Sequence, residues 1–89
     1  MFDIRMKPVI DKAMNLRLKN ISTYKGYKGA ELLKLTFIVN DDLVHMRHWL
    51  KINKYDAVTK MNDCVELIVI FEIPKDENGE QEYYDLKYD

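Results

Sequence analysis

Three stretches of this chain alternate apolar and polar residues with a period of two, and no other feature of the sequence restricts the fold as strongly. Successive side chains of a β-strand point to opposite faces, so this alternation is typical of a strand with one buried face. The three predicted strands would turn the following side chains toward the core: Leu33, Leu35, Phe37 and Val39; Val44, Met46, His48, Leu50 and Ile52; and Val65, Leu67, Val69, Phe71 and Ile73.

Two weaker strands and one helix complete the predicted secondary structure. Residues 15–24 alternate between apolar and polar side chains until Ile21 breaks the pattern, which indicates a β-bulge. Residues 82–88 show the same alternation. Residues 54–62 form the one expected interior helix, because apolar side chains recur there at helical spacing, namely Tyr55, Val58 and Met61. For the first dozen residues a short strand and a helical turn are both left open. Turns are predicted in the segments rich in Gly, Asn and Asp, at residues 24–29, 40–42 and 74–80.

The order of these elements predicts a mainly β fold. Five strands with one short helix between strands 3 and 4 is the connectivity of an OB-like antiparallel barrel, and a bulged first strand suits the sharp bends of a small barrel. The alternative is an open antiparallel sheet with the helix packed across it. A chain of 89 residues fits one domain. Within this single domain, 1–89, residues 1–14 are expected to be an N-terminal extension and residues 15–88 the barrel.

Composition and charge bear on the compartment and on the kind of partner. A single cysteine, Cys64, excludes an intrachain disulfide and a cysteine-based metal cluster, which fits a reducing compartment. No apolar run has the length of a signal sequence or a membrane span, so we expect a cytoplasmic protein without a membrane partner. The net charge is −1, but residues 1–60 hold twelve Lys or Arg against six acids, whereas residues 61–89 hold two against nine. The chain therefore has a basic body and an acidic C-terminal third.

The outward side of the predicted third strand is the candidate binding site. If residues 44–52 form a strand, an imidazole, a guanidinium, an indole and an ammonium group would form one stripe on it. Aromatic rings stack on the bases of single strands, and cations bind the phosphates. The predicted nucleic-acid-binding residues are four from this strand (His45, Arg47, Trp49, Lys51), two from the neighbouring strand (Lys34, Thr36) and four from the first loop (Tyr24, Lys25, Tyr27, Lys28). The other interpretation is a solvated sheet surface on which the tryptophan packs under another segment.

Other chemistry is less favoured by the sequence. His45 and His48 are three residues apart and would share a helical face as metal ligands, but a strand sends them to opposite sides and no third ligand is evident. Cys64 is expected to be a small buried hydrophobic residue rather than a nucleophile. No phosphate-binding glycine motif and no Ser/His/Asp grouping stands out. We therefore expect no catalytic residue, no metal, no cofactor and no enzymatic activity.

Three short motifs resemble small OB-fold proteins of phages and mobile genetic elements. They are NISTYKGYKG at residues 20–29, LLKLTF at residues 32–37 and HWLKI at residues 48–52. The resemblance covers roughly residues 15–73 and implies association with single-stranded DNA during DNA replication or recombination.

These observations together predict a single-stranded nucleic-acid-binding accessory protein that acts with a polymerase, primase or helicase. The alternative is a protein–protein interaction module, such as an inhibitor encoded by a phage or mobile element, without nucleic-acid binding. The choice between DNA and RNA and the existence of a homo-oligomer are left open. For the acidic C-terminal segment, a fifth strand and a docking tail are both left open.

Overall fold

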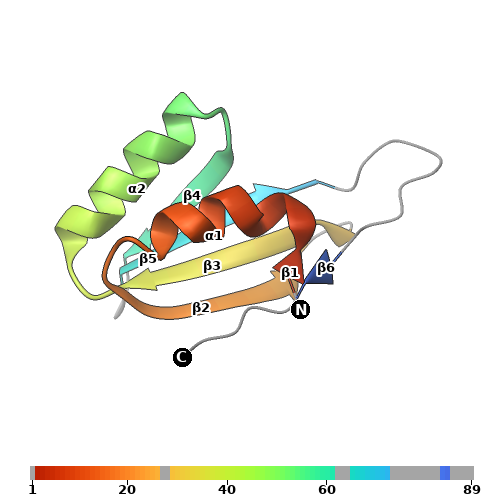
Figure 1. Cartoon of the computed structure of the whole chain (residues 1–89), viewed down its shortest axis with the longest axis horizontal. Helices are drawn as coiled ribbons and strands as arrows, with labels where there is room; N and C mark the ends of the chain where they lie inside the picture. Colours follow the sequence, from red (N-terminus) through yellow and green to blue (C-terminus); the bar gives the residue numbers. More distant parts are fainter. Residues whose placement is uncertain (1, 27–28, 62–64, 73–82, 85–89) are drawn as a thin grey trace.

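The computed structural model describes residues 2–26, 29–61, 65–72 and 83–84. Along the chain these residues form β1 (Phe2–Asp3), the 3₁₀ helix η1 (Ile4–Met6), α1 (Lys7–Ala13), β2 (Leu18–Lys25), β3 (Glu31–Phe37), α2 (Asn40–Ile52), β4 (Asp56–Met61), β5 (Val65–Phe71) and β6 (Tyr83–Tyr84). Figure 1 shows the two helices lying across a four-stranded sheet, with the short β1–β6 pair at one end.

The four-stranded sheet has the order β2-β3-β5-β4, and every neighbouring pair is antiparallel. Since β3 and β4 both run opposite to β5, they run parallel to each other. Parallel strands need a crossover connection, and α2 provides it. This crossover places α2 on one face of the sheet, where α1 lies beside it (Figure 1).

The core lies between the sheet and the two helices. Leu33, Leu35 and Phe37 of β3 face it, together with Leu67, Val69 and Phe71 of β5. The register places Leu33 opposite Val69 and Leu35 opposite Leu67, so both central strands present their apolar sides to the helices. The period-two predictions for these two strands are confirmed in the described residues. The bulge is confirmed as well, because the register of β2 with β3 shifts between Leu18 and Asn20.

The predicted third strand is wrong, because residues 40–52 form the helix α2. Leu43, Met46 and Leu50 are its buried residues, and their spacing of three and four is the period of a helix. Val44 and Ile52, expected in the core, are instead 56% and 63% exposed. Asp41 and Asp42, taken as turn residues, lie in the first helical turn, where acidic side chains stabilise the helix dipole.

The predicted interior helix is also wrong. Residues 56–61 form β4, an edge strand that pairs with β5 from Asp56 opposite Ile70 to Met61 opposite Val65. Tyr55 and Val58, the residues that suggested a helix, lie just before and within this strand. The helix that crosses the sheet therefore lies one element earlier than expected, between the second and third strands of the four-stranded sheet in chain order.

The sheet is open rather than closed into a barrel, so the five-stranded barrel is not confirmed. The described residues form a four-stranded antiparallel sheet with helices packed across one face. An open antiparallel sheet is the alternative that the sequence left open, but the helix across it is formed by residues 40–52 rather than 54–62, and α1 is added.

The N-terminal segment belongs to the folded body rather than extending from it. It forms β1, η1 and α1, and four of its side chains are fully buried: Met6, Val9, Ile10 and Ala13. Pro8 occupies the first turn of α1, where a missing backbone N–H costs no helical hydrogen bond. The sequence left open a short strand or a helical turn for this segment, and the structure has both, a short strand followed by helical turns.

Several predictions concern residues outside the described part of the chain. These are the loop residues Tyr27 and Lys28, the side chains of Cys64 and Ile73, the turn at residues 74–80, and most of the strand expected at residues 82–88. Among the described residues, no helix is both long and apolar enough to cross a membrane.

Candidate functional site

A pocket of about 480 Å³ lies where α2 ends and the chain turns into β4. Two stretches of sequence line it, the last turns of α2 and the segment that follows. The lining residues are Arg47, Leu50, Lys51, Lys54, Tyr55, Asp56 and Ala57. Three of them carry positive charge and one carries negative charge. The pocket is therefore cationic, and its volume lies within the range typical of small-molecule sites.

Helical spacing brings two of these cations together. Arg47 and Lys51 are four residues apart in α2 and therefore lie on the same side of the helix, one turn from each other. Leu50 sits beside them at the edge of the core and is 1% exposed. The apolar side of α2 thus fixes the helix on the sheet, and the adjoining side presents the guanidinium and ammonium groups to the pocket.

Backbone hydrogen bonds at the end of α2 fix the position of the third cation, Lys54. Its N–H donates to the carbonyl of Lys51 at 3.2 Å, and the N–H of Tyr55 donates to the carbonyl of Leu50 at 2.9 Å. This pair of bonds is the Schellman motif that closes many helices. The motif requires a left-handed residue, usually glycine, and Lys54 adopts it with φ of 62°. A lysine in this conformation is strained, and strained residues cluster at functional sites.

No ion pair neutralises these three cations within the residues that the structure describes. Five other cations in the described ranges have carboxylate partners, in the pairs Arg5–Asp3, Lys7–Asp11, Arg17–Asp42, Lys25–Glu31 and Lys34–Glu66, whereas Lys12, Lys19 and Lys60 form no such pair within those ranges. Asp56 lines the same pocket as Lys54 without forming an ion pair to it. The charges of Arg47, Lys51 and Lys54 are therefore available to an anionic ligand.

An aromatic stack connects the pocket to the core. The Tyr55 ring lies parallel to the Trp49 ring, with centroids 5.9 Å apart and planes 14° apart. The Tyr55 ring also contacts the buried Phe71 ring edge-on, and the centroids of these two rings are 5.9 Å apart. Trp49 itself is partly buried and packs against the core. It is therefore a neighbour of the pocket through Tyr55 rather than an exposed platform for a base.

The structure divides the predicted binding stripe. Arg47 and Lys51 meet in the pocket, but Trp49 packs against Tyr55, and His45 is exposed on another side of α2. Residues two apart lie about 200° apart around a helix, so the continuous stripe expected on a strand does not form.

The predicted residues of β2 and β3 lie away from the pocket. The side chains of Tyr24, Lys34 and Thr36 belong to the sheet face opposite the helices, since their neighbours along β2 and β3 face the core. Thr36 is buried, and Lys34 lies 3.8 Å from a carboxylate oxygen of Glu66. Tyr24 is 40% exposed and is the described aromatic residue of this face that a ligand could reach.

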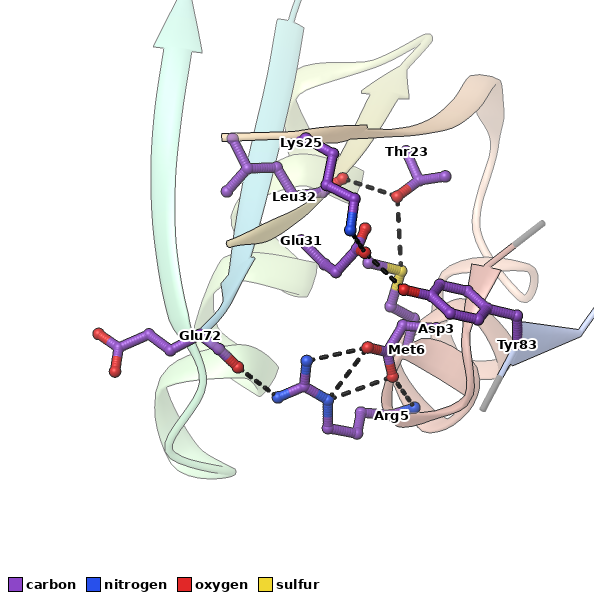
Figure 2. A network of polar contacts seen from close by, with 9 residues as sticks. All are labelled: Asp3, Arg5, Met6, Thr23, Lys25, Glu31, Leu32, Glu72 and Tyr83. Carbon is purple, nitrogen blue, oxygen red and sulfur yellow. Dashed lines mark hydrogen bonds and ion pairs between the residues drawn. The ribbon is translucent and has the colours of Figure 1, made fainter. Parts of the chain in front are cut away.

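A second group of charged residues lies at the same end of the strands as the pocket, where β1 and β6 meet the sheet (Figure 2). Asp3 is buried, and its carboxylate accepts hydrogen bonds from the backbone N–H, Nε and Nη2 of Arg5. Arg5 also donates to the carbonyl of Glu72 and lies 5.6 Å from the centre of the Phe71 ring. Nearby, one carboxylate oxygen of the buried Glu31 accepts from Lys25 at 2.6 Å and from the Tyr83 hydroxyl at 2.8 Å.

The ionisation of this group follows from these contacts. Burial by itself raises the pKa of Asp3, but the hydrogen bonds from Arg5 outweigh burial, so the pKa is lowered. The hydrogen bond to Asp3 raises the pKa of Arg5. The hydrogen bonds to Glu31 raise the pKa of both Lys25 and Tyr83. The donors from Arg5 thus favour the charged form of Asp3, and the carboxylate of Glu31 is satisfied by two donors, as is usual for buried polar groups that hold segments together. We infer that this group holds both ends of the described chain against the sheet.

The sequence did not identify Lys54, Tyr55 or Asp56 as site residues. The available signal was the helical spacing of Leu43, Met46 and Leu50, which would have placed a helix end next to Asn53 and Lys54. The left-handed conformation of Lys54 left no signal, because glycine is the residue that normally marks it.

Comparison with known proteins yields no family, since neither family models, curated proteins nor solved structures contain a match to this chain.

Proposed function

We propose that this chain binds single-stranded nucleic acid and that the pocket at the end of α2 receives its phosphates. The observation that carries the proposal is the convergence of Arg47, Lys51 and Lys54 on one pocket without an ion-pair partner among the described residues. Arginine and lysine side chains are the groups that bind phosphate in most proteins. A short cationic cleft beside aromatic residues suits a flexible strand better than a rigid duplex.

The charge of the site sets the expected affinity. Binding of a single strand with three neutralised phosphates gives a slope of log K against log salt of about −2. The net charge of −1 adds no general attraction for a polyanion. Affinity is therefore modest, and we propose that the chain works as an accessory to a larger replication or recombination enzyme, such as a polymerase, primase or helicase, that holds the same strand.

Trp49 supplies a signal for binding. It is the single tryptophan of the chain, and it stacks on Tyr55, which lines the pocket. A strand that enters the pocket displaces water beside Tyr55 and changes the surroundings of the stack. We expect the tryptophan fluorescence to change on addition of an oligonucleotide, in proportion to the fraction bound.

The test is titration of the full chain with a fluorescent single-stranded oligonucleotide, in EDTA, between about 50 and 200 mM salt. The double variant Arg47→Ala with Lys51→Ala should lower the affinity at least about tenfold and reduce the salt slope by about 0.7 for each cation removed. The matched control is Lys19→Ala with Lys60→Ala, which removes the same charge from exposed positions on β2 and β4. Equal losses in the two double variants would show that binding reflects total charge and would sink the pocket as its site.

A protein-interaction module is the second candidate. The observation that favours it is a row of apolar side chains across the sheet face opposite the helices, where Tyr24 pairs with Leu32 and Leu32 with Ile70. Val58, on the neighbouring edge strand, is 48% exposed. If no oligonucleotide changes the Trp49 fluorescence or binds at low salt, this candidate replaces the first.

A further inference from the structure

The outer side of α2 carries a surface that neither the core nor the pocket uses. Val44, His48 and Ile52 follow each other at intervals of four and form one ridge along the helix. His45 lies next to this ridge. Val44 and Ile52 are 56% and 63% exposed, and together with Ile38, at 61%, they have the largest exposed fractions of the large apolar side chains in the described residues. Apolar groups that project this far are typical of contact surfaces.

The two histidines on this surface suit a transition metal. Residues three apart on a helix lie on the same face, so the helix removes the objection that a strand raised against His45 and His48. Imidazole nitrogen is a preferred ligand of zinc, which usually takes four ligands in a tetrahedron. The described residues contain no group of three or more His, Cys, Asp or Glu able to hold a metal. Within the part of the chain that the structure describes, one copy therefore offers two ligands, which is half of a tetrahedral set.

A second copy of the chain supplies the other half. A two-fold axis midway between His45 and His48 makes two α2 helices antiparallel and brings His45 of each copy level with His48 of the other, with Val44 and Ile52 of both copies along the contact. The same arrangement sets the acidic first turn of one helix, with Asp41, against the basic last turn of the other, with Lys51. The contact is self-complementary in both apolar shape and charge, as a two-fold interface requires.

The size of this contact explains why it needs a metal. α2 has 13 residues and is about 20 Å long, and one side of such a helix covers far less than the roughly 800 Å² that each partner buries in a stable complex. We propose that zinc joins two copies of this chain through α2, with His45 and His48 of each copy as its four ligands. The apolar ridge orients the helices, and the metal holds them.

Sedimentation velocity of the full chain, without oligonucleotide, tests this proposal. In EDTA the chain should sediment as a monomer, and zinc should double its mass with saturation at about half an equivalent per chain. Magnesium, which prefers oxygen ligands, should have no effect. The variant Cys64→Ser should dimerise with zinc as the parent does, which would show that the zinc response does not depend on the cysteine thiol.

Two variants decide the outcome. His45→Ala with His48→Ala should abolish the zinc response, and Val44→Glu should abolish it with both histidines intact, since it charges the ridge. All three positions are exposed, so these changes leave the core untouched. Zinc binding at one equivalent without a change in mass would overturn the proposal, as would a dimer that survives either variant. Neither result bears on the phosphate pocket, whose test is carried out in EDTA.

Discussion

At the scale of single residues, the strongest local interactions hold the ends of the described chain rather than the pocket. Asp3 caps η1 through the N–H of Arg5 and binds the guanidinium of the same residue. Arg5 in turn reaches the carbonyl of Glu72 after β5, 67 residues further along the sequence. Figure 2 shows Asp3 at the centre of these bonds, next to the Glu31 contacts. A residue near the N-terminus therefore fixes the position of a distant strand end.

Replacing Asp3 by Asn should destabilise the fold by about 2 kcal/mol at neutral pH, the usual loss for buried hydrogen bonds to charged groups. The folded-state pKa of Asp3 lies below its ordinary value, so its contribution is present above that ordinary value, near pH 4. It is lost as the pH falls through the lowered pKa. Urea unfolding from pH 7 to pH 2 should show a smaller loss of stability on acidification in Asp3→Asn than in the parent.

Asp11→Asn is the matched control, since Asp11 forms an exposed pair with Lys7 at 3.0 Å. Exposed pairs of this kind contribute little to stability, so the control should unfold almost as the parent does. An equal loss in both variants would contradict the role assigned to Asp3.

At the scale of elements, α2 is where sequence pattern and structure disagree. Residues 43–52 fit a period of two through Val44, Met46 and Leu50, and they fit a helix through Leu43, Met46 and Leu50. Arg47 and Lys51 were assigned to the binding site for being on one face of a strand. They share the pocket because four residues complete about one turn of a helix. The two residues therefore lie close together for a reason that differs from the predicted strand face.

The end of α2 permits a sharp test, because Lys54 occupies a position that favours glycine. Lys54→Gly should raise the free energy of unfolding by up to about 1 kcal/mol, since a left-handed conformation is costly for residues with a Cβ. The same change removes one of the three pocket cations and should weaken oligonucleotide binding. Stability is measured by urea unfolding and affinity by the titration described above.

Lys54→Ala is the companion variant, which removes the charge and keeps the backbone strain. It should weaken binding to the same extent without the gain in stability. A Lys54→Gly variant that binds as tightly as the parent would show that Lys54 takes no part in the site.

At the scale of the whole molecule, the N-terminal segment completes the core. Met6, Val9, Ile10 and Ala13 are fully buried under the same sheet face as α2. Burial of three large apolar side chains contributes roughly 5–8 kcal/mol, which is comparable to the entire stability of a small domain.

Deletion of residues 2–14 should therefore leave the rest of the chain unfolded. Circular dichroism and the dispersion of amide resonances would measure this loss. The control is Lys7→Ala with Asp11→Ala in the full chain, which alters two exposed positions of α1 and should leave the fold intact. A folded truncated chain would contradict the role of this segment in the core.

The amino-acid sequence alone was enough to predict the two central strands, the bulge of β2 and the choice of Arg47 and Lys51 as neighbouring cations. These features depend on local alternation and charge, which a chain carries before it folds. Only the tertiary structure decided that residues 40–52 are a helix, that residues 56–61 are a strand and that the sheet stays open. The physical reason is the topology: β3 and β4 lie parallel on either side of β5, so the chain between them must cross the sheet. A helix satisfies its backbone hydrogen bonds internally as it crosses, and it buries Leu43, Met46 and Leu50 against the apolar face of the sheet. A strand in this place would do neither.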